Sequence, residues 1–385
     1  MFFEDHDDAR TRSLVGGGRF LVLYRLYADN EQAARERAED ICTEQTVEFP
    51  VPLLPPGAIL SEVRGRLENL EKEREGQYLA SVSFADETAA GEFTQFLDVI
   101  FGNISIKPGI QVVRIHPGRG VRSFLRGPRF GVKGIRALLG VPRRPLLFTA
   151  LKPMGLSSSE MARLAAQFVE GGVDIVKDDH GLTNQVFAPF EERVALCAAA
   201  VRESAAKLGR KALYVPNVTA PASQLPERVQ RARELGAGGL LVSPGLTGLD
   251  AVREISERTE GELPIFTHPA FLGSYALTRQ GIAADLLFGT FMRMAGADAT
   301  IFPNCGGRFP LSKEDCLGIA AACRENPENF EPIFPAPAGG MELGNIDDMR
   351  RTYGDDMLVL VGGGLFTCGG DLVENCRRFR AALER

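Results

Sequence analysis

The sequence lacks the features of several large protein classes. Its 385 residues include only four histidines, carry a formal net charge of −6 and give a pI near 5.5. Nucleic-acid-binding proteins usually present a basic face, so the acidic balance argues against that role. No apolar run approaches about 18 residues, so no transmembrane helix is predicted. The N-terminus, MFFEDHDDARTRS, lacks the basic and apolar segments of a secretory signal.

The seven cysteines also lack a recognisable pattern. Their number is odd, and no pair has the CxxC spacing of a zinc site. We therefore expect reduced thiols, most of them packed in the core, as in a cytosolic protein. The 44% hydrophobic and 24% charged residues are ordinary for a globular protein. Together these features predict a soluble cytoplasmic protein with no nucleic-acid or membrane partner.

What the sequence does contain, from about residue 146 onward, is an alternation of apolar β-rich stretches with amphipathic helical stretches. The strand candidates cover residues 146–153, 173–179, 212–219, 239–245, 264–270, 299–304, 331–339 and 357–364. Eight strand–helix units over about 240 residues match a (β/α)8 TIM barrel in count and length. A doubly wound sheet is the alternative, but KPMGLSSSE after the first strand lacks the G-x-G-x-x-G fingerprint.

The N-terminal third has a different pattern. Its strand candidates are residues 19–28 and 76–85, and its helix candidates are residues 30–45 and 89–102. This mixture predicts a small α+β domain. Residues 117–134 are rich in Gly, Pro and Arg and are interpreted as a linker. We therefore predict an N-terminal domain of residues 1–125 and a C-terminal barrel domain of residues 126–385.

The active site of a TIM barrel lies at the C-terminal ends of its strands, so the residues there are candidates for chemistry. The segment VDIVKDDH, residues 173–180, runs from an apolar strand directly into four polar residues. Because alternate strand residues point to the same side, Lys177 and Asp179 are expected to face the barrel mouth together. Carboxylate oxygens suit hard divalent cations, and His180 would suit Mn²⁺, Co²⁺ or Zn²⁺ better than Mg²⁺. A salt-bridge cluster in a turn is the alternative.

Three further strand-end residues have both a catalytic and a structural interpretation. Lys152, in ALKPMG, would transfer protons if burial beside other cations lowered its pKa, and would otherwise be a surface lysine. His268, in FTHPAF, would donate a hydrogen bond to a substrate or be a core histidine. Cys305, near Arg308, would be a reactive thiol if that cation lowered its pKa, and would otherwise be core filler.

Two glycine runs follow the last two strands, at the usual position of a TIM-barrel phosphate site. They are PAGGM, with Gly339 and Gly340, and VGGGLF, with Gly363 and Gly364. Glycine lets backbone N–H groups approach a phosphate closely, and a helix N-terminus adds to the attraction. Ordinary tight turns are the alternative for either run alone.

Together these motifs resemble the RuBisCO superfamily. ALKPMGLSSSE, VDIVKDDH, LYVPNVTA, FTHPAF, PAPAGG and LVGGGLF have the order and spacing of that family, and EQTVEFP and IFGN resemble its N-terminal site segments. The resemblance covers nearly the whole chain. It implies an N-terminal ferredoxin-like domain, a C-terminal TIM barrel, and a homodimer whose active sites use both subunits.

The resemblance also implies roles for individual residues. It makes Lys177 the lysine that reacts with CO2 to form a carbamate, which with Asp179 and His180 would bind Mg²⁺ or another divalent metal. It makes Lys152 the residue that moves the substrate proton. It makes the glycines of the two runs a binding site for one phosphate.

Two residues of the N-terminal domain are assigned in the same way. The resemblance implies that Glu44 and Asn103 contribute to the substrate site of the neighbouring subunit.

Departures from the carboxylases are as informative as the matches. His180 replaces a glutamate, Met154 replaces a second lysine, and Pro269 replaces an arginine that binds the second phosphate. The sixth barrel loop, PNCGGRFPLS, has Arg308 as its only cation instead of a Gly-Lys pair, and Ala338 replaces a serine. These changes imply a monophosphate substrate and no carboxylation, as in the RuBisCO-like proteins.

Enolisation of a sugar phosphate is the chemistry that the superfamily shares. KDDH with EQTVE resembles most the branch that isomerises 5-methylthioribulose 1-phosphate by a 1,3-proton transfer, with Cys305 as a candidate acid or base. One alternative is the 2,3-diketo-5-methylthiopentyl-1-phosphate enolase, whose branch has a lysine base where this chain has Asn103. Another is a 3-oxo sugar-acid phosphate decarboxylase, whose relatives retain the glutamate ligand. A non-catalytic sugar-phosphate sensor is the alternative of another class, and Lys152, Lys177 and Asp179 argue against it.

Overall fold

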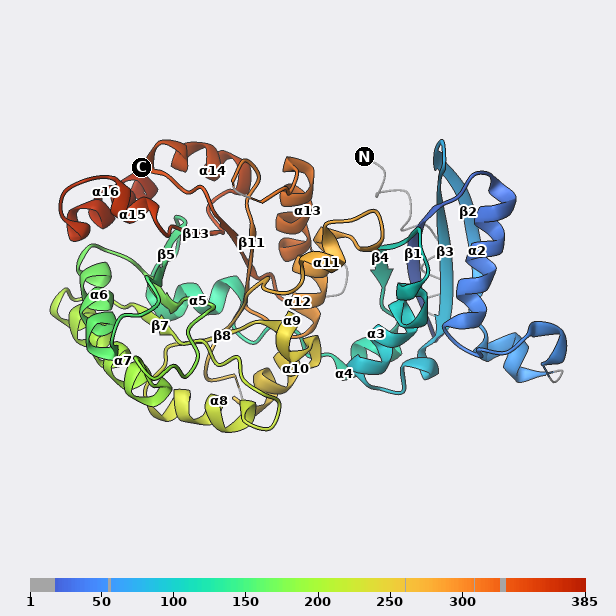
Figure 1. The fold of residues 1–385 in the computed structure, drawn as a ribbon, viewed down its shortest axis with the longest axis horizontal. Helices are drawn as coiled ribbons and strands as arrows, with labels where there is room; N and C mark the ends of the chain where they lie inside the picture. Colours follow the sequence, from blue (N-terminus) through green and yellow to red (C-terminus); the bar gives the residue numbers. More distant parts are fainter. Residues whose placement is uncertain (1–17, 55–56, 260, 308, 326–329) are drawn as a thin grey trace. The chain divides into compact units, whose positions relative to one another are not determined.

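The computed structural model divides into two compact units (Figure 1). The structure describes residues 18–54, 57–259, 261–307, 309–325 and 330–385. The first unit comprises the described residues up to Arg126 and the later segment Ser274–Leu287, and the second comprises Gly127–Gly273 and Phe288–Arg385. The domain boundary between residues 125 and 126 stays a prediction. No helix of the described residues is long and apolar enough to cross a membrane.

The first unit contains a five-stranded sheet in the order β10-β4-β1-β3-β2. Its elements are β1 (Arg19–Tyr27), α2 (Glu31–Glu44), β2 (Arg66–Arg74), β3 (Gln77–Ala85), α3 (Phe93–Phe101), β4 (Ile110–His116), α4 (Arg119–Phe124) and β10 (Gly281–Ile282). Strand β1 pairs antiparallel with β3 and β4, and β10 pairs parallel with β4. The predicted strands β1 and β3 and the predicted helices α2 and α3 are confirmed, whereas β2 and β4 were not predicted.

The second unit contains eight parallel strands in the order β7-β6-β5-β13-β12-β11-β9-β8. They are β5 (Leu146–Leu151), β6 (Ile175–Asp178), β7 (Leu213–Val215), β8 (Leu240–Val242), β9 (Ile265–Thr267), β11 (Ala299–Pro303), β12 (Phe334–Ala338) and β13 (Leu358–Leu360). A parallel bridge between Asn217 and Leu241 joins the β7 side to β8 and closes the barrel. All eight predicted strands are confirmed, each shorter than predicted. The predicted fold class, a TIM barrel after a small α+β domain, is confirmed.

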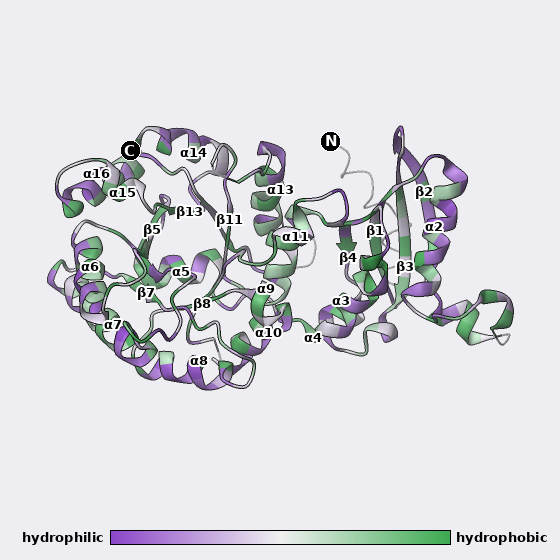
Figure 2. Cartoon of the chain, viewed as in Figure 1, coloured by the Kyte–Doolittle hydropathy of each residue, from purple (hydrophilic) through white to green (hydrophobic). Residues whose placement is uncertain are grey.

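Helices follow the barrel strands and surround them (Figure 1). The longer ones are α6 (Ser158–Glu170), α7 (Phe190–Lys207), α8 (Leu225–Glu234), α10 (Leu249–Arg258), α13 (Lys313–Arg324), α14 (Ile346–Tyr353) and α16 (Leu372–Glu384). The one-turn helices are α9 (Pro244–Thr247), α12 (Met292–Met294) and α15 (Gly364–Thr367), whereas all but the first residue of α11 (Gly273–Ala276) belongs to the later segment of the first unit. Helix α6 begins at a capping box between Ser157 and Glu160, worth about 1 kcal/mol. Helix α8 is largely hydrophilic in Figure 2, as expected for a solvent-facing layer.

The interpretation of residues 117–134 as a linker is wrong. The segment contains α4 and the beginning of α5 (Gly131–Leu139). The α5 residues Ile135 and Leu139 are buried in the hydrophobic cluster of the barrel. Gly118 precedes the first residue of α4, and Gly131 begins α5 with φ +54, a conformation that favours glycine.

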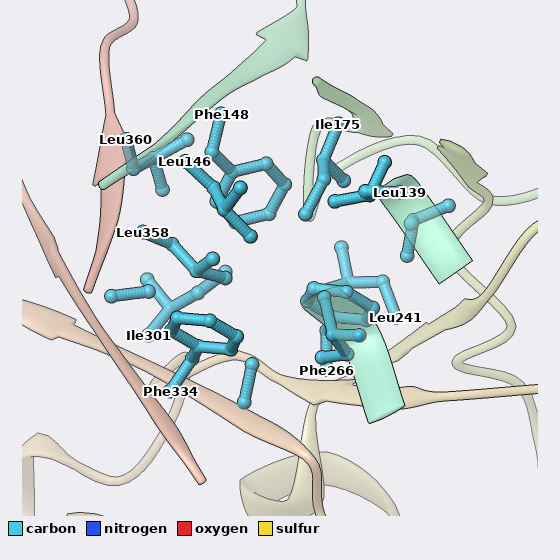
Figure 3. Close-up of a cluster of buried hydrophobic side chains, with 14 of the residues drawn as sticks. Leu139, Leu146, Phe148, Ile175, Leu241, Phe266, Ile301, Phe334, Leu358 and Leu360 are labelled. Atoms are coloured by element: carbon cyan, nitrogen blue, oxygen red, sulfur yellow. The ribbon is translucent and has the colours of Figure 1, made fainter. Parts of the chain in front are cut away.

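Alternate strand residues fill the barrel interior (Figure 3). The labelled members from the strands are Leu146, Phe148, Ile175, Leu241, Phe266, Ile301, Phe334, Leu358 and Leu360. Because side chains alternate along a strand, the residue two positions after a core residue faces the C-terminal mouth. Lys177 follows Ile175 in this way, and His268 follows Phe266. The packed core thus determines which polar residues enter the site.

Two buried aspartates lie at the opposite, N-terminal end of the strands. Asp174, just before β6, accepts hydrogen bonds of 2.7–3.1 Å from Arg144, Arg210 and Arg380. Asp298, just before β11, accepts three backbone N–H groups at 2.7–2.8 Å. Asp174 is therefore paired with cations, whereas Asp298 has hydrogen bonds alone, and burial raises its pKa to about 6 against them.

Candidate active site

The charged side chains at the end of β6 point to two different faces of the strand. Lys177 is 2% exposed and, with Asp179, lies on the interior face of the strand. Asp178 points the other way, where Arg193 of α7 lies 3.1 Å from its carboxylate and the Tyr214 hydroxyl donates to it at 2.7 Å. The sequence predicted no site role for Asp178. It anchors the strand end to α7 and so holds the two residues beside it.

Basic groups gather around the Asp179 carboxylate. The Nζ of Lys152, after β5, lies 2.8 Å from its Oδ2, and the Nδ1 of His180 lies 3.3 Å from its Oδ1. The His180 ring stacks on that of His268, with centroids 4.3 Å apart and planes 11° from parallel. The Nδ1 of His268 accepts a backbone N–H at 3.1 Å, so its Nε2 carries the proton when the ring is neutral. The structure thus brings the predicted mouth residues together.

The electrostatics of this cluster favour particular protonation states. Burial lowers the pKa of the Lys177 amine to about 8, against the charge of Asp179 and helped by that of Lys152. Burial alone would raise the pKa of Asp179, but hydrogen bonds from His180 and Lys152 hold that pKa well below its usual value. Burial and then the charge of Lys177 hold the pKa of His268 well below its usual value. At neutral pH, Asp179 is therefore ionised and His268 is neutral.

Burial beside other cations is the condition under which Lys152 was predicted to have a lowered pKa. In the structure, Lys177 meets this condition and Lys152 does not. The Lys152 side chain is 41% exposed and paired with Asp179, whereas Lys177 is almost fully enclosed. Desolvation therefore acts on Lys177. Lys152 remains on the accessible side of the pair, where a substrate can reach it.

The glycine turns after β12 and β13 form a close backbone cradle. A Cβ built on Gly364 would lie 2.4 Å from a carbonyl oxygen of the turn after β12, and one built on Gly340 would lie 3.4 Å from the Cα of Gly307. Gly339 and Gly340 have φ values of +94 and +69, which favour glycine. A Cβ on Gly363 would meet nothing within 4 Å. The turns thus combine backbone packing at Gly364 with open space at Gly363.

The sixth barrel loop places Cys305 beside residues that hold the loop. Its Sγ lies 3.9 Å from Oδ1 of Asn304, which also accepts the Tyr353 hydroxyl at 2.6 Å. Cys305 is a free, half-buried thiol, and its catalytic role stays a prediction. Arg308, predicted to bind substrate, lies outside the described residues.

Glu44 and Asn103 lie together in the first unit. The Asn103 amide donates to Glu44 at 3.2 Å and to Glu48 at 2.9 Å, and the Nζ of Lys107 lies 2.7 Å from Glu44. Hydrogen bonds from Lys107 and then Asn103 lower the pKa of Glu44. Glu48 has φ +45, which is strained for a non-glycine residue. Lys107 and Glu48 were missed from the sequence, although each lies four residues from a predicted site residue.

Comparison with known proteins identifies the family of the chain. A model of the ribulose bisphosphate carboxylase large chain, catalytic domain, matches residues 131–308. The chain is 38% identical to ribulose bisphosphate carboxylase-like protein 1 of Rhodopseudomonas palustris, over 95% of this chain and 97% of that protein. The chain belongs to the RuBisCO-like proteins.

Other RuBisCO-like relatives carry two different activity names. A protein of Rhodospirillum rubrum named 5-methylthioribulose-1-phosphate isomerase is 32% identical over 95% of this chain and 96% of its own length. A protein of Geobacillus thermodenitrificans named 2,3-diketo-5-methylthiopentyl-1-phosphate enolase is 33% identical over 80% and 75%. The crystal structure of a Rubisco-like protein from Rhodopseudomonas palustris matches with a TM-score of 0.87 and 36% identity, over 95% and 98%.

A metal site at the mouth of this RuBisCO-like protein would need a donor beyond the unmodified side chains. Asp179 and His180 offer two ligating side chains at the mouth. Within the described ranges, no group of three or more His, Cys, Asp and Glu residues could hold a metal ion. A carbamate on Lys177 would supply an anionic oxygen donor, and the enclosed amine, with its lowered pKa, suits that reaction. The residues therefore fit a divalent cation once Lys177 is modified.

Proposed function

We propose that this protein enolises a ketose monophosphate and isomerises 5-methylthioribulose 1-phosphate by a 1,3-proton transfer, without carboxylation. The observation that carries the proposal is the pairing of an accessible lysine, Lys152, with ionised Asp179 at 2.8 Å beside neutral His268. A proton-transfer group next to a ligand of the metal site is what enolisation needs. The R. rubrum relative named as this isomerase supports the choice of reaction.

Each mouth residue has a defined task in this mechanism. A divalent cation held by Asp179, His180 and the carbamate of Lys177 would polarise the substrate carbonyl. Lys152 takes a proton from the carbon next to the carbonyl and returns it two carbons along. His268 donates from Nε2 to a substrate oxygen, because its Nδ1 is occupied by the backbone.

The two ends of the substrate are bound by different chemistry. We assign the phosphate to the backbone of Gly339, Gly340, Gly363 and Gly364. Met154, 51% exposed, stands where carboxylases have a cation, and so does Pro269. An apolar surface at the far end suits a methylthio group better than a second phosphate.

We also propose a cytoplasmic homodimer in which Glu44 and Asn103 complete the site of the second copy. The segment that follows Glu44 exposes six large hydrophobic side chains, each at least 37% accessible: Phe49, Val51, Leu53, Ile59, Leu60 and Val63. A concentration of exposed apolar residues of this kind marks an interaction surface. The free cysteines suit a reducing compartment.

The enolase reaction on a 2,3-diketo monophosphate is the second candidate, because the G. thermodenitrificans relative bears that name. Asn103 argues against it, since an amide cannot act as the base that the branch places there. Lys107 does not replace that base, because burial lowers its pKa less than the hydrogen bonds to Asp40 and Glu44 raise it, so its ammonium gives up a proton less readily than usual.

Deuterium incorporation tests the proposal. The protein is incubated in D2O with 5-methylthioribulose 1-phosphate or the diketo monophosphate, and C–H exchange and products are followed by NMR. We expect exchange and an isomeric ketose from the first substrate. Lys152→Ala should lower exchange by about 10²–10⁴-fold and spare binding, while Lys133→Ala, at an 86% exposed side chain, should change nothing. Binding of these phosphates without any C–H exchange would contradict the proposal that the protein is an enzyme.

A further inference from the structure

The barrel interior contains a buried hydroxyl without a partner, that of Ser243. This residue follows β8 and is 0% exposed, and its Oγ has no hydrogen-bond partner among the described residues. Its backbone N–H, by contrast, donates to the Thr219 hydroxyl at 3.0 Å. A buried hydroxyl without a partner destabilises a fold, so alanine would serve packing better. The hydroxyl therefore indicates a partner that forms only in the working protein.

Strand alternation directs this hydroxyl toward the charged cluster. Leu241, two residues earlier, belongs to the barrel core (Figure 3). Strand alternation therefore makes Ser243 face the interior. The parallel register of β8 with β9 brings Ser243 level with His268. The ring of His180, which follows Lys177 at the end of β6, stacks on that of His268 with centroids 4.3 Å apart. The end of β8, with Ser243, and the end of β6, with Lys177, thus lie on either side of the same histidine.

Accessibility separates Ser243 from the groups that meet a substrate first. The side chains of Lys152 and His180 are 41% and 43% exposed at the mouth. Ser243 and Lys177 are closed to solvent, at 0% and 2%. The partner of the hydroxyl is therefore a group at the buried level of Lys177, and small neutral CO2 can reach that level.

We propose that Ser243 positions the carbamate of Lys177 by donating a hydrogen bond from its Oγ to a carbamate oxygen. This inference rests on the proposed function, which requires that carbamate. In its formation, the amine lone pair of Lys177 bonds to the carbon of CO2, one C=O electron pair moves onto oxygen, and the nitrogen releases one proton. The product has two oxygens that share a negative charge. One is free to ligate a cation, and the other accepts from Ser243.

Carbamate formation itself supplies the test, without any measurement of turnover. The full chain is equilibrated with ¹³C-labelled CO2 over a concentration series, and the carbamate signal is followed by NMR. Lys177→Met identifies the signal by abolishing it. A hydrogen bond to a charged oxygen is lost in Ser243→Ala, so half-carbamylation should need about 10–100-fold more CO2. Ser243→Thr keeps the hydroxyl and should stay near the unmodified protein.

Thermal unfolding without CO2 separates this role from a structural one. Ser243→Ala should unfold at the same or a higher temperature than the unmodified protein, because no partner is lost. Thr149→Val is the matched control, since the Thr149 hydroxyl donates to the Val361 carbonyl at 2.7 Å. That variant should lose stability and keep its affinity for CO2.

Several results would overturn the inference. Equal CO2 dependence in Ser243→Ala and the unmodified protein would do so and leave the proposed function intact, and a rise in substrate KM alone would assign the hydroxyl to the substrate. A large loss of thermal stability in Ser243→Ala would show that the hydroxyl is already paired. Absence of the carbamate signal in the unmodified protein would instead remove the carbamate from the proposed function, and this inference with it.

Discussion

The two ends of the barrel both bury charge, but they treat it in opposite ways. At the N-terminal end, three arginines surround Asp174, and backbone N–H groups bind both oxygens of Asp298. At the mouth, the Lys177 ammonium donates a hydrogen bond to the Asp178 carbonyl at 3.0 Å, and burial lowers its pKa to about 8. The hydroxyl of Ser243 has no partner in the described part of the chain.

This contrast distinguishes charged groups that stabilise the fold, such as Asp174, from groups at the mouth that lack a full set of partners, such as Lys177 and Ser243. A buried ion with a complete set of partners is stable as it stands, and removing a partner is costly. A buried amine whose desolvation outweighs the attraction of nearby carboxylates destabilises the fold while it is protonated, and it becomes neutral and nucleophilic more easily. The predictions below test whether the two ends differ in this way.

The largest effect is expected at the paired end. Asp174→Ala would leave three guanidinium groups without their shared carboxylate, so the free energy of unfolding should fall by about 3–5 kcal/mol. Urea denaturation measures this change, and exchange activity per folded molecule should persist. Asp250→Ala, which breaks a surface pair with Arg253, is the matched control and should cost under about 1 kcal/mol. Equal losses of unfolding free energy in both variants would show that the buried Asp174 network contributes no more than a surface ion pair.

A change of opposite sign is expected at the mouth. Between pH 8 and 10.5 the unfolded chain binds a proton at Lys177 that the folded chain does not, so stability rises with pH in that window. At pH 7 the full penalty is present, on the order of 3 kcal/mol for this pKa difference. Lys177→Met should therefore be more stable than the unmodified protein at pH 7 in CO2-free buffer, and the gain should disappear by about pH 10.5.

Denaturation at several pH values measures that difference. Lys133→Met, at an exposed side chain, should show no such pH-dependent gain. A Lys177→Met variant less stable than the unmodified protein at pH 7 would mean that the amine already contributes to the fold, as the charges at the other end do.

Much of the mouth was predictable because the barrel rule converts strand ends into positions in space. Lys152, Asp179 and His268 follow separate strands, and the alternation of apolar and polar segments locates each strand end. The direction of Asp178 was not predicted, because adjacent carboxylates look alike in a sequence. The partners of its carboxylate, Arg193 on α7 and the Tyr214 hydroxyl, show that Asp178 faces outward.

The failures in the fold have equally local causes. Strand β2, RLENLEKER, has no fully buried residue and alternates between charges and half-buried side chains, as an edge strand can. Its composition therefore gave no strand signal. The orphan hydroxyl of Ser243 was hidden for a different reason, since serine after a strand usually caps a helix or begins a turn. The absence of a partner is visible only in three dimensions.

The smallest effect tests how completely Asp174 is paired. Arg210→Ala removes a 3.1 Å bond to Asp174 but leaves Arg144, which binds both carboxylate oxygens, and Arg380. The unfolding free energy should therefore fall by only about 1 kcal/mol. In the double variant with Asp174→Ala, urea denaturation should show less than the sum of the two losses, because the residues share one network. Additive losses would mean that Arg210 acts through its other bonds, to the Val169 and Val173 carbonyls, and that two arginines already satisfy the carboxylate.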